Sequence, residues 1–399
     1  MKSFDRRSFI RLSGMFSAGA VIAACRNESA IVEAPEPQLP MVRFPEKTEM
    51  ILLTDRPPQL ETPLKYFRTD ITPNEAHFVR WHLADIPTSV DTKTFRLKVT
   101  GYVNKPLELS LDDLRNKFEP ISYVAVNQCS GNSRSFFNPR IAGGQWKNGA
   151  MANAKFTGVK LKDLLDAAGI KAGAVEVSFA GLDRAPLPSV PNFVKSLETN
   201  HANDGEVMVA DAMNDDPLPM LNGFPLRLVV PGWFGTYWVK ALNEISVLPE
   251  KYKGFWMEKA YRIPATADVN ESPDKLAEQT VPINRMVVRS FIIQPEAKES
   301  LRTNQAYDIN GIAFDGGSGI RRVEVSTDGG ATWKDASLGN DLGKYAWRRW
   351  RLNWTPAQTG AHKILVRATS NTGEQQRTSF WNRSGYLRNV IEEVSVTVA

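Results

Sequence analysis

The chain has 399 residues, 42% hydrophobic and 23% charged, an ordinary composition for a soluble protein with room for two domains. Its formal net charge of +5 is modest, and four basic residues and one acidic residue in the first 24 positions account for most of it. No Lys/Arg-rich segment is interleaved with aromatic residues as a nucleic-acid groove requires, so nucleic acid is excluded as a partner.

Residues 1–30 predict an export signal, because a charged segment precedes an apolar run too short to span a membrane. Arg6-Arg7, followed by Ser-Phe-Ile, resembles the twin-arginine signal, which exports folded proteins to the periplasm. An ordinary secretory signal is the alternative. The segment 22–25 also resembles a lipoprotein cleavage site, so the protein is membrane-anchored only if Cys25 carries a lipid. The Pro-rich residues 31–60 are predicted to be a linker.

Residues 61–272 show a mixed α/β pattern. Helices are predicted at Ser110–Phe118, which opens with a capping serine, and at Leu161–Ala168, which Gly169 ends. The strand-type patterns are Thr94–Tyr102, Ile121–Gln128, Ala174–Phe179 and Leu226–Val230.

Residues 273–399 change to short strands separated by turn signals, with the boundary in the polar stretch 264–283. The predicted strands are Val287–Ile293, Tyr307–Phe314, Ile320–Ser326, Trp350–Trp354, Ile364–Ala368 and Val394–Val398. Asp328-Gly329-Gly330 is a strong hairpin signal. The pattern is typical of an all-β sandwich of the immunoglobulin type.

Cysteine usage gives the first indication of chemistry. One of the two cysteines is in the signal region, so Cys129 has no disulfide partner in the mature chain. In an oxidising compartment it is expected to be either a small buried hydrophobe or a ligand. It follows a predicted strand and precedes Gly131, which permits a tight loop, and Arg134, whose charge favours the thiolate. A loop thiolate of this kind leaves the other positions of a metal open.

Two further segments carry arginine or lysine side chains at positions that suit the binding of an anion. In Phe78–His82, the guanidinium of Arg80 can hold an oxyanion bidentately, although a surface salt bridge is the alternative. His82 lies two residues further, so in an extended segment both side chains face the same way. In the segment 222–240, Arg227 and Lys240 suit a phosphate, and glycines allow close backbone approach.

These segments, together with Tyr261 and the stretch 381–389, resemble in sequence and order the sulfite oxidase family of molybdopterin enzymes. Within that family the chain is most similar to the molybdenum subunit of bacterial periplasmic sulfite dehydrogenases. The resemblance covers residues 60–399. It implies an α+β fold, with a molybdopterin-binding catalytic domain at 61–272 and an immunoglobulin-like dimerisation domain at 273–399.

The resemblance also assigns roles. Cys129 is expected to be the only protein ligand of the molybdenum, and Tyr261, Arg80 and His82 are the expected catalytic residues. The expected cofactor-binding residues are Phe78, Val79, Arg80, Trp81, His82, Cys129, Asp183, Asn222, Arg227, Trp238, Val239 and Lys240. Asn222 and Trp238 depart from the histidines common in the family.

The expected substrate-binding residues are Arg80, His82, Arg134, Trp146 and Arg388. Arg383 is the alternative to Arg388 as the arginine that the 381–389 segment contributes. Other readings remain open for two residues: Trp146 could be a core tryptophan, and Asp183 could cap a turn.

The resemblance predicts oxidation of sulfite to sulfate at a molybdenum–molybdopterin centre. No C-x-x-C-H haem site is present, so a separate c-type cytochrome is the expected electron acceptor, and a homodimer is expected. Two alternatives remain. One is an exported molybdopterin reductase of sulfoxides, and the other is a non-catalytic module that keeps the fold without the metal.

Overall fold

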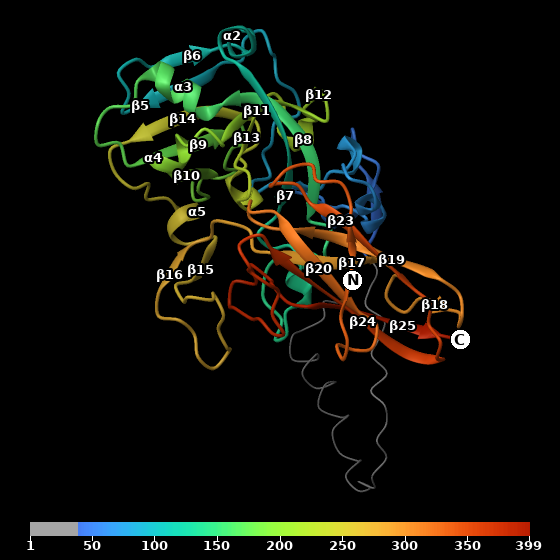
Figure 1. Ribbon diagram of the computed structural model, residues 1–399. Helices are drawn as coiled ribbons and strands as arrows, with labels where there is room; N and C mark the ends of the chain where they lie inside the picture. Colours follow the sequence, from blue (N-terminus) through green and yellow to red (C-terminus); the bar gives the residue numbers. More distant parts are fainter. Residues whose placement is uncertain (1–38) are drawn as a thin grey trace, which may run out of the picture. The chain divides into compact units, whose positions relative to one another are not determined.

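A computed structural model describes residues 39–399 of the chain (Figure 1). The export signal, Cys25 and the first part of the predicted linker lie outside the described residues. Within residues 39–399, no helix is long and apolar enough to cross a membrane. The secondary structure is mostly strand with few helices.

Three sheets build the part of the chain up to residue 248. A four-stranded sheet has the order β1 (Met41–Arg43), β2 (Glu49–Thr54), β3 (Gln59–Glu61) and β4 (Val79–Arg80). A five-stranded sheet has the order β10 (Val194–Glu198), β9 (Glu176–Gly181), β14 (Leu242–Leu248), β5 (Leu97–Gly101) and β6 (Leu107–Leu109). The third has the order β12 (Asp216–Pro217), β11 (Met208–Met213), β8 (Met151–Lys160) and β7 (Pro120–Gln128), and β13 (Arg227–Val229) also pairs with β11.

Short helices connect and cover these sheets. α2 (Leu111–Lys117) begins with a capping box, in which Ser110 and Asp113 each accept a hydrogen bond from the other's backbone N–H. α3 (Leu161–Ala168) buries its leucines on one face and ends at Gly169, whose φ of 67° suits a glycine. The remaining helices are α4 (Thr199–Ala202), α5 (Phe255–Glu258) and the 3-10 helices η1 (Leu64–Arg68), η2 (Asn74–Ala76), η3 (Arg134–Phe136), η4 (Met220–Asn222) and η5 (Gly235–Tyr237).

The β7–β8 pair connects the two regions of the chain. It stays in antiparallel register from Pro120↔Val159 to Gln128↔Met151 and extends toward the C-terminal sheets (Figure 1). The amide of Val126 in β7 donates to the carbonyl of Tyr345, 2.9 Å away. Because β7 ends at Gln128, the cysteine loop starts from a rigid strand end.

The C-terminal region consists of two sheets around a shared apolar core. One has the order β17 (Arg289–Gln294), β19 (Tyr307–Phe314), β23 (Arg348–Trp354) and β22 (Ser337–Leu338). The other has the order β18 (Ser300–Leu301), β25 (Glu392–Val398), β24 (Gly360–Ser370), β20 (Ile320–Ser326) and β21 (Lys334–Asp335). The hairpin β15 (Arg262–Pro264) and β16 (Thr280–Pro282) precedes both.

Strand β17 is buried on both faces. Ile292 points into the core between the two C-terminal sheets, whereas Phe291 and Ile293 belong to the large core of the preceding region. Phe67 of η1 packs against Phe291 and Trp347, with ring centroids 6.1 and 5.0 Å apart. The large core of the preceding region therefore extends onto the C-terminal sheets.

The predicted helices and strands named above are confirmed with shifts of a few residues at their ends. The linker prediction for residues 31–60 is wrong from Met41 onward, because β1, β2 and β3 form a sheet there and bury Met50 and Leu60. Lys47 in the same segment is buried too, and its ammonium donates to the carbonyl of Asn74, 2.8 Å away.

A buried ion-pair cluster fixes the end of the chain. Glu392 lies between Arg289, 2.7 Å away and nearly fully buried, and Arg388. Burial alone would raise the pKa of Glu392, but the two guanidinium groups outweigh it and hold the pKa below its usual value.

We expect Glu392→Gln to lower the free energy of unfolding by about 3 kcal/mol, because it leaves buried cations without their counter-charge. The depressed pKa gives stability that is present above the unfolded-state value near 4 and is lost as the pH falls through the folded-state pKa. Urea denaturation of both proteins at pH 7 measures the difference. Glu393→Gln is the matched control, because the exposed pair with Lys363 should contribute less than about 1 kcal/mol. Equal stabilities of the two variants would contradict this account.

Candidate active site

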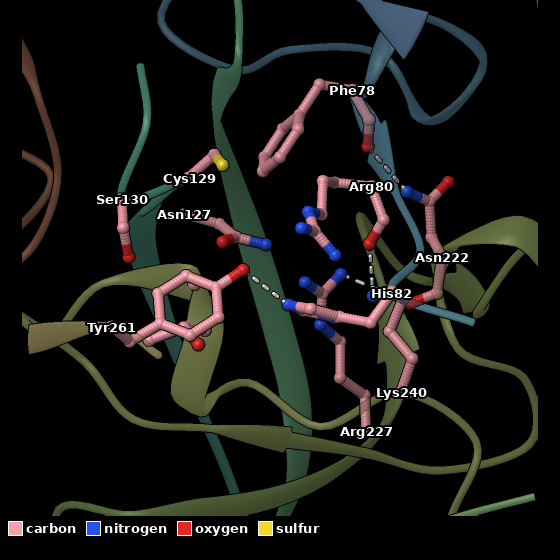
Figure 2. A pocket seen from close by; sticks show the side chains of 12 residues that line it. Phe78, Arg80, His82, Asn127, Cys129, Ser130, Asn222, Arg227, Lys240 and Tyr261 are labelled. Atoms are coloured by element: carbon pink, nitrogen blue, oxygen red, sulfur yellow. Dashed lines mark hydrogen bonds between the residues drawn. The ribbon is translucent and has the colours of Figure 1, made fainter. Parts of the chain in front are cut away.

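A cavity of about 370 Å³, counted with its opening, lies where β4, the β7 end, η4, η5 and the segment before β15 meet (Figure 2). The side chains of Cys129, Arg80, His82 and Tyr261 point toward it (Figure 2). It is lined by Phe78, Arg80, His82, Asn127, Cys129, Ser130, Asn222, Arg227, Gly235, Thr236, Lys240 and Tyr261. Residues that are far apart in sequence are thus brought to one site.

The extended segment at β4 divides its side chains between two environments. Phe78, Arg80 and His82 line the cavity. Val79 and Trp81 point to the other side and pack in the core of the β1–β4 sheet. The two-residue period of an extended chain explains this split. The side chains of Val79 and Trp81 therefore do not line the cavity, and the predicted cofactor contact of these two residues stays a prediction.

The cysteine loop is held by backbone and amide hydrogen bonds. The amide of Cys129 donates to the carbonyl of Ala150 at 2.9 Å, and the amide of Ala150 donates to the side chain of Asn132 at 3.0 Å. Cys129 is buried against Phe78 and Trp146, with its thiol at the cavity. The buried carboxylate of Glu61 accepts a hydrogen bond from the amide of Gly149 at 2.8 Å and so anchors the segment just before β8. The thiol is held in place without a disulfide or an ion pair.

The cavity collects cations without a carboxylate. Arg80, Arg227 and Lys240 line it, and no Asp or Glu is among its lining residues. Arg227 donates to the carbonyl of Asn222 at 3.1 Å and Lys240 to the carbonyl of Arg80 at 2.7 Å. Burial lowers the pKa of Arg227 to about 9; burial and the charge of Arg227 lower the pKa of Lys240 to about 7. An anion in the cavity would relieve this repulsion.

Several polar atoms of the lining residues have no hydrogen-bond partner in the described part of the chain. They are Arg80 Nη1, Asn127 Oδ1 and Nδ2, Ser130 Oγ, Arg227 Nε and Thr236 Oγ1. Buried polar groups are rarely left unpaired, so this surface is built for a polar, anionic ligand. Such a surface beside a thiol fits a molybdenum–molybdopterin cofactor, whose pterin and phosphate require both donors and acceptors. Cys129 would hold the metal, and Arg227 and Lys240 would face the phosphate.

His82 and Tyr261 form a hydrogen-bonded pair, with 2.6 Å between Nε2 and Oη (Figure 2). Burial lowers the pKa of His82 well below its usual value, and Arg80 lowers it further. Burial raises the pKa of Tyr261 above its usual value, so imidazole and phenol are both neutral at pH 7. Tyr261 also has a φ of 56°, a strained conformation for an aromatic residue. The strain and the short contact hold the phenol at the cavity.

Arg134 lies behind Tyr261 in a socket of glycines. A Cβ atom added at Gly131, Gly143 or Gly385 would come within 2.8 to 2.9 Å of its guanidinium. Arg134 lies over the ring of Tyr386, 5.0 Å from its centroid, and Tyr386 stacks on Tyr261 at 5.9 Å. Arg134 therefore approaches the site, although it does not line the cavity itself.

The expected third arginine of the anion pocket is not found at the cavity. Arg388 pairs with Glu392 and lies over the ring of Phe136. Its alternative, Arg383, is bound by the carboxylate of Glu271. Each guanidinium is thus engaged by a carboxylate, four positions along the chain for Arg388 and 112 positions away for Arg383. The prediction that Arg388 lines the substrate pocket is therefore corrected: the segment presents Tyr386 to the site instead.

Four other expected residues lie one layer behind the cavity. Trp146 packs beside Cys129, and Trp238 donates its indole N–H to the carbonyl of Val230, 2.8 Å away, and faces Phe156. Val239 is part of the large core. The pKa of Asp183 is raised by burial to about 6, and its charge acts on Lys240. These residues support the lining rather than form it.

Sequence reasoning did not single out several residues of the site. Asn127 and Ser130 flank the cysteine and Thr236 follows Gly235, so the motifs themselves contained the signal. No local pattern indicated Lys47, because its ammonium donates to the side chain of Asn222, which is 175 positions away in the sequence. Asn222 in turn donates to the carbonyl of Phe78 at 3.1 Å (Figure 2), so its amide is engaged within the protein.

Comparisons with known proteins agree with this chemistry. The family model of the oxidoreductase molybdopterin-binding domain matches residues 83–256, and that of the Mo-co oxidoreductase dimerisation domain matches residues 280–399. The structure is similar to the crystal structure of the sulfane dehydrogenase SoxCD from Paracoccus pantotrophus. The TM-score is 0.71 and the identity 25%, over 94% of this chain and 97% of that chain. The fold and site are those of a molybdopterin-binding oxidoreductase.

Individual relatives show which family of molybdopterin-binding oxidoreductases the chain resembles. Sulfite oxidase of Gallus gallus is 32% identical over 89% of this chain and 79% of its own length. Mitochondrial sulfite oxidase of Rattus norvegicus is 34% identical over 86% of this chain, and the match spans 63% of that relative. A nitrate reductase of Hordeum vulgare is 31% identical over 82% of this chain and 39% of its own length. The chain belongs to the sulfite oxidase family.

We expect Arg227→Met to lower the molybdenum content of the purified protein at least several-fold, because it removes a cation facing the anionic cofactor. In cofactor-free protein the same change should not lower the melting temperature, because a buried guanidinium without a carboxylate is replaced by an apolar side chain. Metal analysis and thermal unfolding measure the two effects. Arg115→Met is the control, since Arg115 is exposed and pairs with Asp211. Unchanged metal content in Arg227→Met would remove this residue from the cofactor site.

Proposed function

We propose that this chain is a sulfite dehydrogenase, which oxidises sulfite to sulfate at a Cys-ligated molybdenum–molybdopterin centre. The observation that carries the proposal is one cavity with a thiol, an arginine free of carboxylates and a neutral His–Tyr pair, in a member of the sulfite oxidase family. A c-type cytochrome is the proposed electron acceptor.

The reaction adds one oxygen from water to sulfite and releases two electrons and two protons. When bound, the molybdenum cofactor supplies the oxygen-transfer and two-electron chemistry. Arg80, with Nη1 unpaired, binds an oxygen of the anion and orients it. Arg134 adds a positive charge near Tyr261. Neutral His82 can accept a proton that passes through the Tyr261 hydroxyl.

The remaining proposals concern location and assembly. We propose that the protein is exported by the twin-arginine route, with Arg6-Arg7 as the signal, and acts in the periplasm. Cell fractionation of a double lysine variant at these positions tests the route. The dimerisation-domain match supports a homodimer, and the C-terminal region is proposed to be an immunoglobulin-like sandwich.

The test of the function is molybdenum content and sulfite-dependent reduction of cytochrome c, measured on the same sample. We expect stoichiometric metal and turnover in the wild type. We expect no turnover in Cys129→Ser, in which the metal loses its thiolate ligand. Metal without sulfite turnover in the wild type would refute the sulfite assignment while leaving the cofactor in place. Reduction of methionine sulfoxide instead would favour a reductase.

We expect Arg80→Gln to raise the KM for sulfite by at least ten-fold while the molybdenum content stays normal, because a charged hydrogen bond to the anion is worth about 1.5–3 kcal/mol. Steady-state kinetics with metal analysis of the same preparations checks this. Arg96→Gln is the control, since Arg96 is exposed and donates only to backbone carbonyls. Unchanged sulfite kinetics in Arg80→Gln would exclude Arg80 from the substrate site.

A second candidate is oxidation of a sulfane sulfur, a sulfur atom bonded to another sulfur. Two observations favour it: the similarity to SoxCD, and the placement of Arg383 and Arg388 away from the cavity, which leaves the pocket less cationic. Comparing kcat/KM for sulfite and for a small persulfide separates the two. A higher value for the persulfide would favour this second function.

A further inference from the structure

A buried lysine lies directly behind the His82–Tyr261 pair. Lys195 in β10 is fully buried, and its ammonium donates to the carbonyl of Trp256 at 2.7 Å. The same group lies 4.5 Å from the ring centroid of Tyr237 and 5.3 Å from that of Tyr261. None of the described carboxylates forms an ion pair with it. A buried ammonium with one carbonyl and two aromatic faces is far costlier than an apolar side chain of the same length, so packing alone does not explain it.

The register of β10 ties this lysine to the pair. Lys195 and Phe193 are two positions apart, so both side chains lie on one face of the extended segment. Phe193 stacks on the ring of His82 with centroids 3.6 Å apart, while Lys195 lies against Tyr261. One segment therefore contacts both members of the hydrogen-bonded pair from behind, away from the cavity.

The charged and titratable groups around Lys195 are few. Tyr237 faces it from η5, and Tyr261 and Arg262 face it from the chain after α5. Burial lowers the pKa of His82 most, and the charges of Arg80, Lys240 and Lys195 lower it further, in that order. Burial, together with the charge of Arg262, lowers the pKa of Lys195 to about 7. Lys195 is therefore positively charged below about pH 7, which is the pH range in which a histidine would take up a proton.

We propose that Lys195 is a positioning residue, whose charge keeps His82 unprotonated and thereby extends turnover of the proposed sulfite reaction to lower pH. It acts through His82 and Tyr261 and touches neither substrate nor cofactor. The proposal rests on the proposed function for its kinetic consequence only. The effect on the protonation of His82 is a property of the folded chain.

The test compares wild type, Lys195→Met and the control Lys162→Met, all loaded with cofactor. Lys162 is a half-buried residue of α3 whose ammonium reaches the surface and pairs with Asp166. In Lys195→Met we expect the acidic limb of the kcat profile to move to higher pH by up to about one pH unit, because one of the three like charges that act on His82 is removed. The KM for sulfite should change less than about two-fold, and the control should match wild type.

The second readout is the titration of His82 by ¹³C-histidine NMR, with its signal among the four histidines assigned by His82→Asn. A raised His82 pKa in Lys195→Met supports the proposal even if the wild type does not turn over sulfite, in which case only the function fails. Identical His82 titrations overturn it, whatever the melting temperature does. If Lys195→Met does not fold, the wild-type His82 signal decides: a second step near pH 7, where Lys195 loses its proton, supports the proposal, and its absence overturns it.

Discussion

The repulsion among buried cations is the constraint on which this site depends. Arg80, Arg227 and Lys240 share one cavity with no carboxylate in its lining, and the pKa of Lys240 is lowered by burial first and then by the charges of Arg227 and Arg80. Such an arrangement costs several kcal/mol unless an anion offsets it. Strands hold these cations close together: Arg227 is the first residue of β13, which pairs with β11, and Arg80 is the last residue of β4. The charge of the site is therefore a property of the scaffold.

The site also depends on the C-terminal region. Arg134 is held between Gly143 and Gly385, and its guanidinium donates to the carbonyl of Ser384 at 3.3 Å. Tyr386 connects it to Tyr261 by stacking. Strand β17 packs on both faces, and Tyr386 packs against the same large core as Phe291 and Ile293 of this strand. This shared core fixes the segment that carries Tyr386 relative to the cysteine loop. A change in the packing of β17 would thus reach the cavity without altering any residue that lines it.

Local patterns in the sequence predicted two helices, many of the strands and part of the site, and long-range partners account for the rest. The strand leading to Cys129 and the alternation of Arg80 and His82 follow from spacing alone. Strand β8, with sequence MANAKFTGVK, was not predicted because it has no run of β-branched or aromatic residues; its pairing with β7 and β11 overrides propensity. Arg388 pairs with Glu392 four positions along the chain, but Glu392 is held by the buried Arg289 from 103 positions away, a contact that no local pattern contains. Lys195 could not be singled out from the sequence, because its proposed role depends on its contacts with the rings of Tyr237 and Tyr261.

The lowered pKa values of two buried lysines make the binding of an anionic cofactor depend on pH. Lys47 and Lys240 have pKa values near 7, both lowered first by burial, with Arg227 as a common neighbour. A phosphate placed beside Lys240 would raise its pKa again, so that binding near neutral pH takes up protons. Binding of such an anion should accordingly weaken as the pH rises above 7. Lys195 is different, because Tyr261 lies between it and the cavity and its charge is not neutralised by the cofactor. Buried lysines can therefore differ in role: Lys240 lines the cavity and can face such an anion, whereas the role proposed for Lys195 is to keep His82 neutral.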